Sequence, residues 1–144
     1  MEELVERLRV AYLVLDDGDR RTIAAADLTP TQYNLLRTAD EHPEDPSVSS
    51  VAKELLCTRG NVTRLVSRMA AQGLVETVGD KDDQRLVRVR ITDDGRERLN
   101  QARALLAEAD ERRFGSLAPS ELTHYREVLD EMIQLMRADL DARF

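Results

Sequence analysis

Between residues 47 and 91 the apolar side chains recur first at helical spacing and then in alternation, and this order limits the folds open to the chain. Residues 47–56 and residues 58–72 each carry a helical pattern, and only a short turn separates them. Gly73 follows the second pattern as an expected C-terminal cap. Two short helices joined in this way predict a helix-turn-helix. The inward stripe of its second helix is expected to consist of Val62, Leu65, Val66 and Met69.

The residues after this pair of helices have the composition of β-strands. Residues 74–78 have strand character, residues 79–84 form a polar loop, and residues 86–91 alternate in polarity. The expected faces of the last segment are Val87, Val89 and Ile91 on one side, and Arg88 and Arg90 on the other. A β-hairpin that follows a helix-turn-helix is a wing. The sequence therefore predicts a mainly α fold with a small β-hairpin wing, a winged helix-turn-helix.

Further helical patterns precede this lobe. Residues 2–25 predict a helix, with a kink or break expected at Asp16–Asp19. The next helix is expected to begin at Thr29 as its N-cap, with Pro30 in the first turn and Gln32 completing a capping box. Two prolines then predict a loop before the helix-turn-helix.

Two long helical patterns follow the hairpin, at about residues 93–114 and after Pro119. A monomer would leave apolar stripes of the terminal helices partly uncovered, whereas a two-fold related copy of the chain would bury them. The predicted dimerisation residues are Leu4, Leu8, Leu129, Met132 and Met136. We predict one domain over residues 1–144, with the winged helix-turn-helix lobe at 28–95 and a helical dimerisation region at 1–27 and 96–144.

The net charge of −7 argues at first against a nucleic-acid partner, but its distribution does not. Between Lys53 and Arg98 ten basic side chains outnumber eight acidic ones, and residues 58–72 contain three arginines and no acid. Phosphate contact depends on the local field rather than on the net charge. Double-stranded DNA is therefore an admissible partner for the second helix of the helix-turn-helix.

Other classes of protein find little support. A single cysteine excludes an internal disulfide and a thiolate zinc cage, and His42 and His124 have no partner at metal-ligand spacing, so we expect no metal and no cofactor. No nucleophile–base constellation or phosphate-binding glycine loop is evident, so we expect no enzyme. No apolar run is long enough to span a bilayer and no signal-peptide pattern is present, so we expect a cytoplasmic protein without a membrane partner.

Five short motifs follow one another at consistent spacing: Leu28-Thr29-Pro30-x-Gln32-Tyr33, Val62-Thr63-Arg64-Leu65-Val66, Gly73-Leu74-Val75, Asp83-x-Arg85 and Ile91-Thr92-x-x-Gly95. Together they resemble the MarR family of bacterial transcriptional regulators over residues 28–95. The sequence departs from the family pattern where Thr77, Val78 and Gln84 stand at positions that often hold basic residues.

The resemblance implies a homodimer with interleaved terminal helices, recognition helices in successive major grooves and wings at the flanking minor grooves. By similarity, Arg85 would enter the minor groove and Asp83 would orient it. Family members often respond to small aromatic or phenolic molecules. By the family's layout, Tyr12, Tyr33 and Arg37 are expected to line the pocket of such an effector.

The predicted recognition helix carries side chains that suit the major groove. An arginine fork matches the two acceptors of guanine, and Asn61 could serve adenine in the same way. Thr58 and Thr63 could hold phosphates. The DNA-binding prediction for this helix covers Thr58, Arg59, Gly60, Asn61, Thr63, Arg64, Ser67 and Arg68, and for the wing Asp83 and Arg85. The alternatives are a solvated helix face for the arginines and a local surface pair for Asp83 and Arg85.

Cys57 lies in the turn of the helix-turn-helix, where we expect it to pack in the core as a small hydrophobe. A redox-responsive regulator acting through this thiol is an alternative. The sequence as a whole predicts a ligand-responsive repressor that binds a pseudo-palindromic operator as a homodimer. The alternative from another class is a winged-helix module whose recognition face docks an acidic protein.

Overall fold

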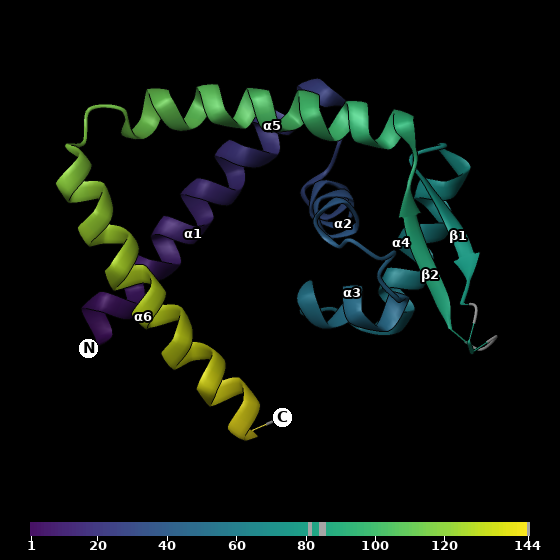
Figure 1. Cartoon of the computed structure of the whole chain (residues 1–144). Helices are drawn as coiled ribbons and strands as arrows, with labels where there is room; N and C mark the ends of the chain where they lie inside the picture. The colour runs from purple at the N-terminus through teal and green to yellow at the C-terminus, as the bar shows by residue number, and fades with distance from the viewer. Residues whose placement is uncertain (81, 84–85, 144) are drawn as a thin grey trace. The chain divides into compact units, whose positions relative to one another are not determined.

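The computed structural model describes residues 1–80, 82–83 and 86–143. The chain divides into two compact units, Met1–Ala107 and Glu108–Phe144. The elements in chain order are α1 (Glu2–Ile23), the short 3-10 helix η1 (Ala24–Ala26), α2 (Pro30–Glu41), α3 (Val48–Glu54), α4 (Arg59–Ala71), β1 (Val75–Gly79), β2 (Val87–Ile91), α5 (Asp93–Phe114) and α6 (Pro119–Arg143) (Figure 1). The predicted class, mainly α with a β-hairpin wing, is confirmed. The predicted boundaries between lobe and dimerisation region stay a prediction.

Helix α1 is continuous, and the predicted break at Asp16–Asp19 is wrong. Two ion pairs support the helix there, because Asp17 accepts from both Arg20 and Arg21 one turn further on. The hydroxyl of Thr22 also donates to the carbonyl oxygen of Gly18 at 2.8 Å. These local interactions offset the low helix propensity of aspartate and glycine.

Hydroxyl side chains begin the helices of the lobe. The amide of Gln32 donates to Thr29 Oγ1 at 3.3 Å and the amide of Thr29 donates to Gln32 Oε1 at 2.9 Å, which confirms the predicted capping box. Ser47 caps α3 and Thr58 caps α4 in the same manner. Thr92 accepts from the amide of Gly95 and so caps α5. These caps satisfy amides that a helix start leaves without partners.

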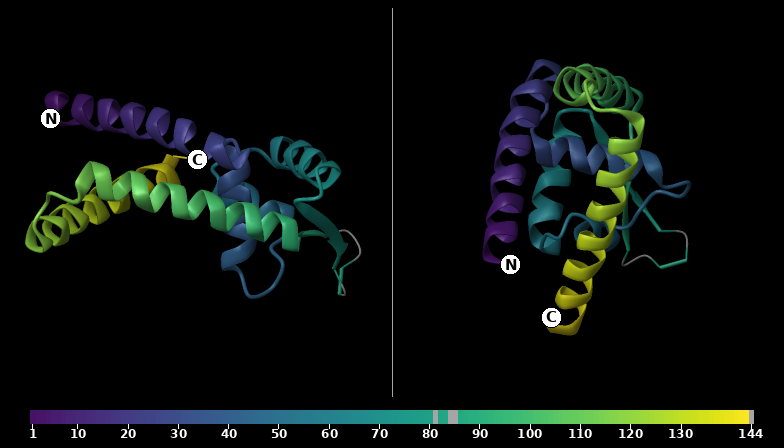
Figure 2. Two further views of the ribbon diagram at one scale, coloured as in Figure 1. Left: turned by 90° about the horizontal axis from the view of Figure 1, so that it is seen from above. Right: turned by 90° about the vertical axis from the view of Figure 1, so that its left-hand side faces the viewer.

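The hairpin pairs β1 and β2 antiparallel, with Val75 opposite Ile91 and Gly79 opposite Val87. It runs outward beside α4 (Figures 1 and 2). Val89 and Ile91 are buried as predicted, but Val87 is 41% exposed, because it lies at the outer end of β2.

A single hydrophobic cluster forms the interior of Met1–Ala107. Helix α2 contacts α1, α3 and β2, and Figure 1 shows it end-on among them. The predicted inward stripe of α4 is buried at all four positions. The largest fully buried side chains of the cluster include Ile23, Leu35, Leu36, Met69, Leu74 and Leu99.

The second unit holds the last turns of α5 and the whole of α6. No side chain of α6 is buried, although the helix is 25 residues long. Its exposed apolar side chains recur at helical spacing and include Leu122, Tyr125, Leu129, Ile133, Met136 and Leu140. An uncovered apolar stripe of this length marks an interaction surface.

The helices α3 and α4 end in the same hydrogen-bonded turn. After α4, Gly73 adopts φ 74°, and the amide of Leu74 donates a hydrogen bond to the carbonyl of Met69. After α3, Leu56 takes the same left-handed conformation at φ 51°, and the amide of Cys57 donates to Ala52. Leucine is strained in this conformation, whereas glycine is not. Burial of the side chain does not offset this strain, since the side chain of Leu56 is 80% exposed.

We therefore expect Leu56→Gly to stabilise the fold by about 1 kcal/mol, because relief of left-handed strain exceeds the added entropy of the unfolded chain. The matched opposite change, Gly73→Ala, should destabilise it by a similar amount. Urea unfolding monitored by circular dichroism measures both. A lower midpoint for Leu56→Gly would contradict this interpretation.

Gly95 allows the start of α5 to approach the end of α4. A Cβ at this position would lie 2.0 Å from the carbonyl oxygen of Leu74, which also accepts the amide of Thr92 at 3.2 Å. At Gly60, in contrast, a Cβ would meet nothing within 4 Å. The junction of α4, the hairpin and α5 therefore depends on the absence of one methyl group.

We expect Gly95→Ala to destabilise the protein by about 1–3 kcal/mol, because backbone must move to admit the methyl group. The control Gly60→Ala should be neutral or slightly stabilising, since alanine favours the helix. Differential scanning calorimetry of the two variants gives the comparison. Equal melting temperatures would refute the assigned close approach.

Candidate nucleic-acid interface

Helix α4 turns one face inward and presents the opposite face to solvent. Burial of its apolar stripe fixes this orientation. All eight residues predicted for DNA contact by this helix are exposed: Thr58, Arg59, Gly60, Asn61, Thr63, Arg64, Ser67 and Arg68. The structure therefore brings these residues together on one accessible side of the lobe, beside the hairpin (Figure 1).

The guanidinium groups of Arg59, Arg64 and Arg68 make no hydrogen bond or ion pair with any part of the chain that the structure describes. Arg88 and Arg90, in contrast, are each paired with carboxylates. No acid lies in residues 58–72. The outer face of α4 thus presents uncompensated positive charge on an acidic chain.

Two hydroxyl groups of this face have partners within the helix. Thr58 Oγ1 accepts from the amide of Asn61 at 3.3 Å, and Thr63 Oγ1 donates to the carbonyl of Arg59 at 2.9 Å. Thr58 is therefore the N-cap, a role that sequence reasoning did not assign. Phosphate contact by either threonine stays a prediction.

The wing carries an aspartate that the sequence analysis missed. Asp80 Oδ1 accepts from the amides of Asp82 and Asp83 at 2.8 and 2.9 Å, and Oδ2 accepts from Arg88 Nε. Its side chain is only 7% exposed. Aspartate at a turn binds amides two and three residues on, so its position at the start of the polar loop was the available signal. Arg85 lies outside the described residues, and its orientation by Asp83 stays a prediction.

Hydrogen bonding lowers the pKa of Asp80 to about 2. The amides of Asp82 and Asp83 contribute most, and the guanidinium of Arg88 adds to them, while burial acts in the opposite direction. At pH values above its ordinary pKa of 3.8, the ionised Asp80 therefore stabilises the folded hairpin. This contribution is lost as the pH falls through its pKa in the folded protein, about 2.

The arginines of β2 do not project freely from the hairpin. Arg88 Nη1 donates to the backbone carbonyl of Asp45 at 2.7 Å. Arg90 binds the Asp45 carboxylate at 2.8 Å and Glu76 at 3.3 Å. Sequence reasoning placed both arginines on the outer face but could not identify partners so distant in the chain.

Cys57 is exposed, so the prediction that it packs in the core is wrong. The left-handed Leu56 ends α3 before it, and the thiol donates to the carbonyl of Leu55 at 3.3 Å. The side chain of Cys57 therefore lies in solvent after the C-terminal end of α3. The redox alternative remains a prediction.

Two of the three residues predicted for an effector pocket share a cavity. Tyr12 and Tyr33 line a cavity of about 170 Å³ between α1 and α2, together with Leu15, Asp16, Asp19, Ile23, Pro30, Asn34 and Leu106. Arg37 does not line it and instead pairs with Glu41 at 3.0 Å. Binding of an effector in this cavity stays a prediction.

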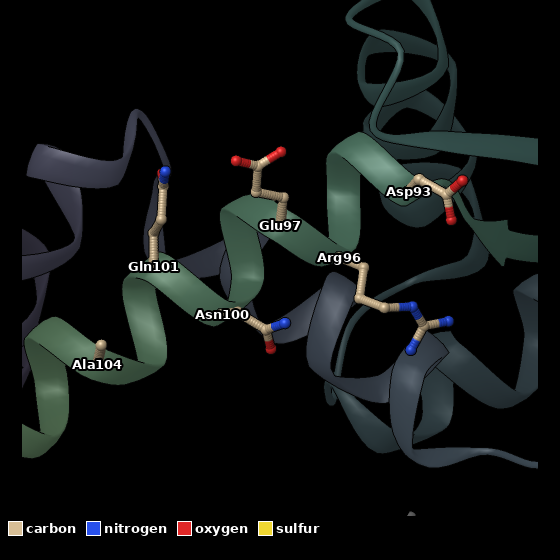
Figure 3. Close-up of a pocket in the computed structure, with 6 residues that line it drawn as sticks. All are labelled: Asp93, Arg96, Glu97, Asn100, Gln101 and Ala104. Atoms are coloured by element: carbon tan, nitrogen blue, oxygen red, sulfur yellow. The ribbon is translucent and has the colours of Figure 1, made fainter.

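A second hollow follows α5, where Figure 3 shows its six lining residues. Glu97 and Gln101 point to one side of the helix, and Arg96 points to the other (Figure 3). Arg96 and Arg103 both pair with Asp40 of α2, whose side chain is 13% exposed. The hollow is shallow, most of its lining residues are of polar type, and none of the predicted site residues lines it.

Within residues 1–80, 82–83 and 86–143, no group of three or more histidine, cysteine or acidic side chains could hold a metal ion. None of the helices described there combines the length and apolarity needed to cross a membrane.

The lobe matches a known family. Residues 26–86 match the family model described as MarR family. The HTH-type transcriptional repressor IacR of Pseudomonas putida is 26% identical over 110 residues, which cover 76% of this chain and 65% of that repressor. The chain thus spans less than two thirds of the length of this relative.

Solved structures share the fold. The M. tuberculosis transcriptional regulator MosR, solved in complex with DNA, is 23% identical with a TM-score of 0.76, covering 97% of this chain and 98% of that one. CouR from Rhodococcus jostii, solved with p-coumaroyl-CoA, is 23% identical with a TM-score of 0.73, covering 86% of each chain. At these identities the likeness concerns the fold. The family match over α2, α3, α4 and β1 therefore shows that this part of the chain is similar to the MarR family, within a chain whose fold is shared by the solved structures.

Proposed function

We propose that the chain is a homodimeric transcriptional regulator that binds duplex DNA through α4 and the wing. It acts as a repressor on a pseudo-palindromic operator in the cytoplasm, and a small molecule releases it. The observation that carries the DNA-binding part is the acid-free outer face of α4 with three guanidinium groups that have no partner among the described residues.

The geometry of α4 supports base recognition. An α-helix fits the major groove, and arginine forks bind guanine there with two hydrogen bonds. Arg64 and Arg68 lie one turn apart on the exposed side, with Arg59 at the helix start. The acidic remainder of the chain disfavours non-specific contact with phosphates. The MosR structure in complex with DNA is a relative of the same fold.

The uncovered stripes of α1 and α6 support dimerisation. Among the predicted residues, Leu4 is 49% exposed, Leu129 48% and Met136 53%, while Leu8 and Met132 are intermediate. A second copy would cover apolar surface of this kind and place two recognition helices about one helical turn of DNA apart.

Release by a small molecule rests on the cavity of Tyr12 and Tyr33. Its lining combines aromatic and apolar side chains with Asp16, Asp19 and Asn34, which suits a small aromatic or phenolic compound, and CouR was solved with p-coumaroyl-CoA. A ligand that binds better to a dimer with another spacing of its recognition helices would shift the population away from the DNA-binding state.

The main test replaces Arg64 by alanine after selection of an operator from a random duplex pool. We expect the variant to lose about 1–3 kcal/mol of discrimination at the contacted base pair. Arg21→Ala removes the same charge from α1 and should leave base preference unchanged. Wild-type binding should weaken log-linearly with salt, by a slope of about −0.9 per neutralised phosphate. Equally weak wild-type affinity for every duplex would refute the proposal and favour a module that docks an acidic protein.

The dimer is tested by Leu129→Asp, which places a charge in the apolar stripe of α6. We expect this variant to sediment as a monomer and to bind a single half-site, because a buried unpaired carboxylate opposes association. Gln134→Asp adds the same charge on the opposite side of the helix and should remain dimeric. If both variants remain dimeric and the dissociation constant of the dimer is unchanged, this interface is disproved.

A further inference from the structure

A continuous set of contacts joins the wing loop to the first helix of the helix-turn-helix. We call it the wing tie and define it as Asp80, Arg88 and the backbone of Asp45. Asp80 belongs to the loop after β1, Arg88 to β2, and Asp45 to the segment before α3. None of these residues was among those predicted to contact DNA.

The first part of the wing tie orders the start of the loop. One carboxylate oxygen of Asp80 accepts the amides of Asp82 and Asp83, while the other accepts from Arg88 Nε. The amide of Leu86, the residue before β2, donates to the carbonyl of Asp83 at 2.9 Å. Removal of the Asp80 carboxylate would take this acceptor from the two amides and from Arg88 Nε.

The second part fixes the loop to the helix-turn-helix. Arg88 also donates to the carbonyl of Asp45 at 2.7 Å. Arg88 forms a β-bridge with Ser47, the N-cap of α3, and the amide of Val89 donates to Pro46 at 2.9 Å. One guanidinium therefore contacts the wing loop and the residues that lead into α3.

We propose that Asp80 and Arg88 are positioning residues for DNA binding, which hold the described wing residues Asp80, Asp82 and Asp83 against the segment that leads into α3. This inference rests on the proposed DNA-binding function. Neither residue contacts DNA in this arrangement. They act by ordering these described wing residues before DNA binds, so that less free energy of binding is spent on ordering them.

Direct contact of Arg88 with a phosphate is the competing explanation, and the geometry disfavours it. The guanidinium is bound to Asp80 and Asp45, and its side chain is 32% exposed. Asp80 is ionised at neutral pH because its pKa is about 2. The two explanations differ in sign for Asp80, since loss of an acid near a phosphate would strengthen binding, whereas loss of the wing tie would weaken it.

The experiment compares Asp80→Asn, Arg88→Gln and the double variant on the selected operator. We expect each single change to weaken binding about tenfold, and the double variant to be no weaker than either, because both changes break one coupled unit. Hydroxyl-radical footprints should lose protection at the flanks and keep it at the centre. Arg90→Gln removes a guanidinium of the same strand that binds the carboxylates of Asp45 and Glu76 but leaves every contact of Asp80 in place, and should change the affinity less than threefold.

A second readout needs no DNA. Amide exchange at Asp82 and Asp83 should accelerate in Asp80→Asn, because the neutral amide oxygen of asparagine is a weaker acceptor than the carboxylate, and in Arg88→Gln. It should remain at the wild-type rate in Arg90→Gln. The inference is overturned if the DNA footprint is lost at the flanks and at the centre alike, in proportion to the loss of folding stability. Additive effects in the double variant would also overturn it, and so would tighter DNA binding by Asp80→Asn. If the wild type binds its operator selectively and the variants bind with unchanged affinity, only this inference is overturned. A wild type without selectivity overturns the proposed function as well.

Discussion

Burial of four apolar side chains along α4 determines which surface of this protein faces outward. Val62, Leu65, Val66 and Met69 are each at most 6% exposed, so a rotation of the helix about its axis would bring apolar groups into water. The arginines and polar side chains of the other face are consequently held outward by the core rather than by partners of their own. The position of the hairpin depends on the same core, which contains Val75 and Val89.

Charge is distributed so that α4 differs from the rest of the chain. The net charge is −7, and many arginines outside α4 are paired with carboxylates, as at Asp17, Asp40 and Asp80. These pairs join elements: Asp40 links α2 to α5, and Arg88 links the hairpin to the segment before α3. Ion pairs thus serve the assembly of the lobe, while the arginines on the outer face of α4 have no carboxylate partner among the described residues.

Local signals in the sequence predicted most of the lobe, and interactions between distant segments account for the errors. The capping box at Thr29, the glycine after α4 and the stripe of α4 depend on neighbouring residues, and each was predicted correctly. The exposure of Cys57 follows from a strained leucine at a position where glycine is usual, which no periodicity reveals. Asp45, the partner that Arg88 and Arg90 share, lies more than forty residues away, and a sequence pattern has no means to pair it with them.

The exposed apolar stripe of α6 has a consequence for the stability of this helix. Since none of its 25 residues is buried within the chain, much of the energy that maintains the helix must come from whatever covers the stripe. Order in α6 is then linked by mass action to the concentration of that covering partner. If the partner is a second copy of the chain, the fraction of molecules in which α6 is ordered rises with the concentration of the protein itself.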